Sequence, residues 1–172
     1  MTFPDNAVIR DTLALFPDHL HTLAEGIGIK IRLLEPGERY NSVSPTLSRL
    51  ALDVDVWPVP PAGLFIVDER TILIRRATPM TVAHEYGHAI DCALGGGLYR
   101  TASDPEIQKA FRNATQWVTP YAATRSDEYF AESVRAFVGA NDAVSPWPKA
   151  TRERLLKVDP AMYEIVSSIF TP

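Results

Sequence analysis

The spacing of apolar residues divides the chain into a helical, an alternating and a second helical stretch. In the first stretch the apolar residues recur at steps of four, three, four and three, on one face of a helix: Ile9, Leu13, Phe16, Leu20 and Leu23. Pro17 lacks a backbone donor, so this stretch is predicted to kink or to divide into two short helices. Gly26 and Gly28 then predict its end.

Between residues 29 and 76 the period shortens to two, as it does in half-buried strands. Four strands are predicted from the alternating or β-branched runs, at residues 29–33, 50–56, 64–67 and 72–74. A hairpin loop is predicted between the last two. The proline-rich segment before residue 64 predicts a rigid loop, because a central strand cannot hold so many prolines.

From residue 77 onward the pattern is helical again. Thr78-Pro79 combines a capping hydroxyl with proline at the first helical position, which predicts a helix that runs to about Leu94. Capping residues predict the starts of three further helices: Ser103, Thr124 and Asp159. These elements predict one α+β domain over residues 1–172, with a helix and a small twisted mixed sheet at 1–77 and a mostly helical part at 78–172.

Composition excludes several broad classes of protein. The chain of 172 residues is 46% apolar and 22% charged, which rules out a disordered chain. A net charge of −4 argues against a nucleic-acid partner bound through a broad basic surface. No apolar run approaches the ~20 residues of a membrane span. The single Cys92 and the lack of a signal-peptide core favour a cytoplasmic protein, with non-classical export left open.

The sharpest chemical motif is H-E-Y-G-H at residues 84–88, inside the helix predicted to begin at residue 79. His84 and His88 lie one turn apart on one face, so both imidazoles can reach one metal ion. Glu85 lies about 100° around the helix, where a carboxylate can take a proton from water. Imidazole and carboxylate ligands favour zinc, one ion per chain. The alternative is a chance match, and the other two histidines, His19 and His21, are expected to be solvated.

A catalytic zinc site needs a third protein ligand and leaves one position for water. Asp91 shares the helix face of the histidines but lies a turn further on with a short side chain, so a supporting acid or a surface acid is the better interpretation. Glu128 and Glu132 lie four residues apart and project from one side of a later helix. They are either associated with the metal or an ordinary acidic first turn.

Taken together, these motifs resemble a known family. The residues H-E-Y-G-H-A-I-D at 84–91, followed by Tyr121 and by E-Y-F-A-E at 128–132, are similar to the zinc protease domain of anthrax lethal factor. Pro-Pro endopeptidases and other lethal-factor-like zincins share this pattern. The resemblance runs from about Thr78 to Phe170, and before that only the order of elements is similar.

The resemblance implies a single zincin-like metalloprotease domain and a role for each matched residue. Together with the two histidines, Glu128 would be the third zinc ligand, and Glu85 would be the general base. Tyr121 corresponds to a tyrosine whose hydroxyl faces the oxyanion of the tetrahedral intermediate. Glu132 corresponds to a glutamate that supports a ligating histidine.

The implied activity is zinc-dependent hydrolysis of a peptide or protein substrate. In the related proteases the substrate lies extended along an edge strand beside the active-site helix, which here would be residues 71–76. Ile72, Ile74 and Arg75 are then expected to contact the substrate. Arg75 and Arg76 either favour acidic substrate residues or are simply solvated charges at a strand end.

Two other functions fit parts of the pattern. One is a regulatory protease of the H-E-x-x-H type that cleaves transcriptional repressors. Those proteins place the downstream glutamate differently and often carry a DNA-binding segment, which the sequence does not indicate. The other is a zinc-stabilised binding domain without turnover, which needs neither Glu85 nor Tyr121. The presence of both residues favours an active endopeptidase.

Overall fold

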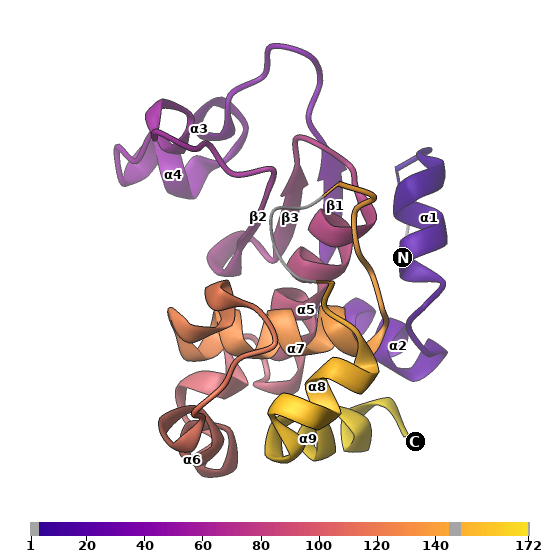
Figure 1. The fold of residues 1–172 in the computed structure, drawn as a ribbon. Coiled ribbons are helices and arrows are strands. Elements are labelled where there is room, and N and C mark those ends of the chain that lie inside the picture. The colour runs from indigo at the N-terminus through magenta and orange to yellow at the C-terminus, as the bar shows by residue number, and fades with distance from the viewer. Residues whose placement is uncertain (1–3, 145–148, 172) are drawn as a thin grey trace.

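The computed structural model describes residues 4–144 and 149–171. Helices dominate the fold, and a small sheet lies beside the long helix α5 (Figure 1). The helices are α1 (Ala7–Leu13), α2 (Asp18–Gly26), α3 (Tyr40–Val43), α4 (Pro45–Arg49), α5 (Pro79–Leu94), α6 (Pro105–Asn113), α7 (Ser126–Phe137), α8 (Arg152–Val158) and α9 (Pro160–Phe170). The strands are β1 (Lys30–Leu33), β2 (Gly63–Ile66) and β3 (Thr71–Ile74). No helix in the two described ranges is long and apolar enough to cross a membrane.

The first two helices confirm the predicted break at Pro17, which directly precedes α2. The expectation that the two histidines of α2 are solvated was wrong. His19 Nε2 lies 2.8 Å from the carbonyl oxygen of Ile169, and His21 Nδ1 lies 2.7 Å from the hydroxyl of Tyr86. At a spacing of two residues the side chains do point apart, but each meets another helix, so they connect α2 to α9 and α5.

The described residues form three strands rather than the four expected. The alternation at residues 50–56 does not produce a strand, because Asp53 caps a 3-10 turn, η1 (Val54–Val56), by accepting the N–H of Asp55 over 3.2 Å. Leu50 and Leu52 remain exposed. A local bond between a side chain and the backbone therefore overrides the period of two.

Strand β3 is central in the sheet. It pairs with β1 in parallel and with β2 in antiparallel fashion, and Ile72, Leu73 and Ile74 are all buried. The expectation that residues 71–76 form an edge strand is therefore wrong. An uninterrupted apolar run is typical of a strand that is covered on both faces. The edge strand next to α5 is β2.

The long helix α5 forms as predicted. Thr78 Oγ1 accepts the N–H of Thr81 over 3.2 Å, and the helix ends at Leu94. Helix α7 crosses α5 closely at Gly87, which has no side chain to keep the helices apart. A Cβ atom added there would lie only 3.0 Å from the Cα atom of Ala131. This close crossing brings the glutamates of α7 to the histidines of α5.

The core surrounds α5 and extends through the sheet. The apolar side chains that α5 contributes are almost fully buried: Val82, Ala83, Tyr86, Ala89, Ile90 and Cys92. A smaller cluster, which includes residues of β2 and β3, joins the sheet to the segment of α3, α4 and η1: Leu34, Tyr40, Leu47, Val54, Ile66 and Leu73. Packing on several sides holds α5 in one position.

Candidate metal centre and active site

Three possible metal ligands meet between α5 and α7. His84 and His88 lie one turn apart on α5, and Glu128 lies in the first turn of α7. The Nε2 atoms of the two histidines are 3.2 Å apart. Oε2 of Glu128 lies 3.1 Å and 3.3 Å from them, which completes a nearly equilateral triangle. Within the described residues, no other group of His, Cys, Asp or Glu side chains converges in this way.

This triangle has the size of one face of a tetrahedral zinc site. Zinc bound to nitrogen and oxygen ligands at about 2.0–2.1 Å separates neighbouring ligand atoms by about 3.3 Å. Oε2 of Glu128 is buried and makes no well-aligned hydrogen bond with the described residues. Such a carboxylate oxygen is costly unless a cation lies beside it. The three residues therefore fit a zinc ion.

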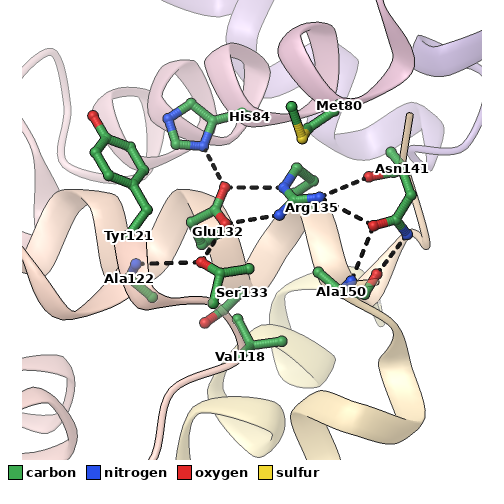
Figure 2. Close-up of polar contacts among 12 residues, drawn as sticks. Met80, His84, Val118, Tyr121, Ala122, Glu132, Ser133, Arg135, Asn141 and Ala150 are labelled. Atoms are coloured by element: carbon green, nitrogen blue, oxygen red, sulfur yellow. Dashed lines mark hydrogen bonds and ion pairs between the residues drawn. The ribbon is translucent and has the colours of Figure 1, made fainter. Parts of the chain in front are cut away.

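Glu132 orients the ring of His84. Its Oε1 lies 2.8 Å from Nδ1 of His84 (Figure 2). When the Nδ1–H donates to this carboxylate, the lone pair of Nε2 is directed toward the triangle. Glu132 is held in turn by the hydroxyl of Thr119, which donates to Oε2 over 2.5 Å, and by the guanidinium of Arg135.

Glu85 lies beside the triangle, next to strand β2. It is only 7% exposed, and burial raises the pKa of its carboxyl against the opposing effect of His84 and His88. The strand approaches this closely because Gly63 has no side chain: a Cβ atom there would lie 2.7 Å from Cγ of Glu85. The carboxyl group is therefore confined between the helix and the edge strand.

Gly63→Ala is expected to displace Glu85 and to lower the free energy of unfolding. The added methyl group would also lie 2.7 Å from Cγ2 of Thr81, and overpacking of this kind costs about 1–3 kcal/mol. Chemical denaturation measures the change. Gly26→Ala is the matched control, because a Cβ atom at Gly26 meets nothing within 4 Å. Equal destabilisation of the two variants would contradict this account.

Tyr121 lies at the mouth of the site. Its hydroxyl donates to Oε1 of Glu128 over 3.0 Å, and its ring centroid lies 5.7 Å from that of His84. Partial burial and the Glu128 carboxylate raise the pKa of Tyr121, so the hydroxyl keeps its proton. Tyr121 is 41% exposed, which makes it accessible to a molecule that enters from solvent.

Comparison with known proteins places this arrangement in a known fold. No protein-family model matches the sequence, and no curated protein matches it either. Among solved structures, the Pro-Pro endopeptidase of Paenibacillus alvei matches with a TM-score of 0.68, over 99% of this chain and 95% of that one. The chain has the fold of a Pro-Pro endopeptidase. The two sequences are 19% identical, and the likeness also covers the first 77 residues, where the sequence motifs found no match.

Asp91, the other acid on the face of the two histidines, lies outside the ligand triangle. It is fully buried, and its carboxylate accepts the N–H (3.0 Å) and the hydroxyl (2.7 Å) of Thr101. Burial raises the pKa of Asp91 to about 6, although the bonds from Thr101 oppose this shift. Asp91 is thus not a surface acid, and it connects α5 to the short turn η3 (Arg100–Ala102).

The three residues expected to contact substrate are occupied in other ways. Ile72 and Ile74 are buried in the central strand β3, whose two edges are both paired. The guanidinium of Arg75 forms an ion pair with Asp55 and lies 4.4 Å from the ring centre of Tyr40. The edge strands are β1 and β2, and β2 is the one that borders Glu85.

Tyr99 lies beside the ligand triangle, and the sequence did not indicate it. Its ring centroid lies 5.6 Å from that of His88 and 6.2 Å from that of Phe65 on β2. The ring therefore lies between the ligand triangle and the edge strand. Tyr99 follows the three glycines after α5, and no spacing rule relates a loop residue to the histidines. Only its position just after the helix that carries the two histidines could have drawn attention to it.

Zinc binding is expected to release a proton and to become tighter as the pH rises. Burial alone would lower the pKa of His84, but its contacts with Glu128 and Glu132 outweigh burial and raise the pKa from 6.5 to about 10 in the metal-free protein. Because Nε2 must be deprotonated to bind zinc, the Kd is expected to fall about tenfold per pH unit near neutrality. Competition with a chelator at several pH values measures this dependence, and a constant Kd would contradict it.

The same shift affects the stability of the metal-free protein. Because the folded state holds the His84 proton more tightly than the unfolded state, this contribution is complete below pH 6.5 and is lost as the pH rises through about 10.

Proposed function

We propose that this chain is a zinc-dependent endopeptidase. The observation that carries the proposal is the ligand triangle with the carboxyl of Glu85 and the hydroxyl of Tyr121 beside it. The fold shared with a Pro-Pro endopeptidase supports the same activity. A site that binds zinc only for stability needs neither a buried base nor a hydroxyl donor at its mouth. These two groups favour turnover over a zinc-stabilised binding domain.

His84, His88 and Glu128 would hold one zinc ion, which polarises a carbonyl and lowers the pKa of bound water to roughly 7. Glu85 takes a proton from the attacking water and passes it to the leaving amide nitrogen. Burial raises the pKa of Glu85, which makes it a stronger base than a solvated carboxylate. Tyr121 donates its hydroxyl hydrogen to the carbonyl oxygen as negative charge develops there.

The substrate would be a peptide in extended conformation along β2. Among the described residues β2 pairs with β3 on one side only, and it borders Glu85 through Gly63, so strand addition on its other side would place a peptide beside the catalytic groups. Tyr99, whose ring packs against the buried Phe65, would contact its side chains. Because the structural neighbour is named a Pro-Pro endopeptidase, peptides that contain a Pro-Pro sequence are the first substrates to test.

The proposal predicts that the zinc-loaded protein cleaves members of a peptide library that includes Pro-Pro sequences. Removal of zinc by a chelator is expected to stop cleavage, and added zinc is expected to restore it. Mass spectrometry of the products identifies the bond that is cut. A folded, zinc-loaded protein that cleaves no peptide in the library, but retains some of them, would instead support a binding domain.

A further inference from the structure

Arg135 is a buried charge that contacts neither the ligand triangle nor Glu85. It is 2% exposed, and arginine is seldom buried to this extent unless it is paired. Its guanidinium makes two bonds to Glu132, from Nε to Oε1 over 2.9 Å and from Nη2 to Oε2 over 2.7 Å (Figure 2). A two-point pair of this kind fixes the orientation of both partners.

The remaining nitrogen of Arg135 is also held. Nη1 donates to the carbonyl of Ala140 over 3.1 Å and to Oδ1 of Asn141 over 3.3 Å. Asn141 in turn makes two hydrogen bonds with the backbone of Ala150, of 2.7 Å and 2.9 Å. The guanidinium therefore cannot rotate without breaking contacts with the segment that follows α7.

This series of contacts leads to His84. Oε1 of Glu132 faces both Nε of Arg135 and Nδ1 of His84, while Oε2 faces Nη2 of Arg135 and the hydroxyl of Thr119. An ionised carboxylate accepts the Nδ1–H of the imidazole. This bond sets the angle of the imidazole ring and directs Nε2 toward Glu128 and His88. The orientation of Glu132 therefore determines the orientation of the His84 ring.

We propose that Arg135 is a positioning residue of the metal centre. By fixing Glu132 in one orientation, it holds the ring of His84 so that Nε2 faces the ligand triangle. Arg135 acts through Glu132 and touches neither metal nor substrate. This inference rests on the proposed function, because it requires the triangle to bind zinc. Asn141 and Ala150, which follow α7 in the sequence and contribute no atom to the ligand triangle, are then also part of the support of the site.

Arg135→Gln tests the proposal through zinc affinity and the environment of the His84 ring. The variant is expected to bind zinc about 10–100-fold more weakly in a chelator competition, the usual loss for residues that support a ligand. Nitrogen NMR of the zinc-loaded protein is expected to show a shifted Nδ1 signal for His84, because its contact with Glu132 is loosened. Arg135→Lys keeps the charge without the planar fork, so part of the affinity is expected to return.

Arg154→Gln is the matched control, because Arg154 is half-buried and donates to the carbonyl of Val118. If Arg135→Gln does not fold, Glu132→Gln/Arg135→Met replaces it, since both charges of the buried pair are then removed together. The inference would be overturned if either folded variant bound zinc as tightly as the wild type and showed the same His84 spectrum. Wild-type protein that binds no zinc would refute the proposed function itself, a result that is distinct from any outcome with the variants.

Discussion

Glu85→Gln is expected to abolish peptide hydrolysis while zinc content and fold stay unchanged. The amide has nearly the size of the carboxylate but cannot take a proton from water, and loss of a general base lowers kcat about 10²–10⁴-fold. The proposed metal ligands are untouched, because Glu85 contributes no atom to the ligand triangle. Cleavage assays on the zinc-loaded variant measure the rate, and elemental analysis measures the bound metal.

The same variant is expected to be at least as stable as the wild type near neutral pH. Burial raises the pKa of Glu85 in the folded state, so its ionised form destabilises the fold relative to the unfolded chain. A neutral amide removes that cost. The matched control is Glu164→Gln, which neutralises an exposed carboxylate on α9 and is expected to change neither rate nor stability. Cleavage by Glu85→Gln at the wild-type rate would exclude Glu85 as the base.

The active-site helix is predictable from the sequence because its signals are local. A capping hydroxyl at Thr78, proline at the next position and glycine at Gly95 define both ends of α5. The period of the helix then places His84 and His88 on one face. None of these inferences requires knowledge of how distant parts of the chain pack.

The third proposed ligand, Glu128, is different, because it lies on another helix. How near Glu128 comes to His84 depends on how closely α5 and α7 cross, and that crossing depends on the small residues Gly87 and Ala131. Spacing along the chain left both a metal-associated pair and an ordinary acidic first turn open, with the acidic first turn the more common case. The structure separates the two glutamates, because Glu128 faces Nε2 of the histidines whereas Glu132 faces Nδ1 of His84.

Strand order and burial are the features that local pattern reasoning misses. The run Thr71–Ile74 has the pattern of a strand, but its central position follows only from pairing with β1 and β2. Similarly, Glu132 and Arg135 lie three residues apart, a spacing that is common for exposed ion pairs on helices. Their burial, and the contacts of Arg135 with Ala140, require the tertiary structure.

Glu128→Ala is expected to remove most of the zinc while the protein stays folded. Glu128 provides the sole oxygen of the ligand triangle, so its loss leaves two imidazoles to hold the ion. Zinc affinity is therefore expected to fall by more than about 100-fold, the upper end for residues that only support a ligand. Elemental analysis after dialysis and a chelator competition measure the change. Circular dichroism of the metal-free proteins checks the fold.

Two comparisons make this result specific to Glu128. Glu106→Ala removes an exposed acid from α6 and is expected to leave zinc binding unchanged. Asp91→Ala tests the other acid that the sequence offered, and because Thr101 occupies both of its oxygens, this variant is expected to lose stability rather than zinc affinity. Zinc retained by Glu128→Ala but lost by a folded Asp91→Ala would reverse the two assignments. A rearrangement of η3 would then be required to free Asp91 from Thr101 and bring it to the histidines.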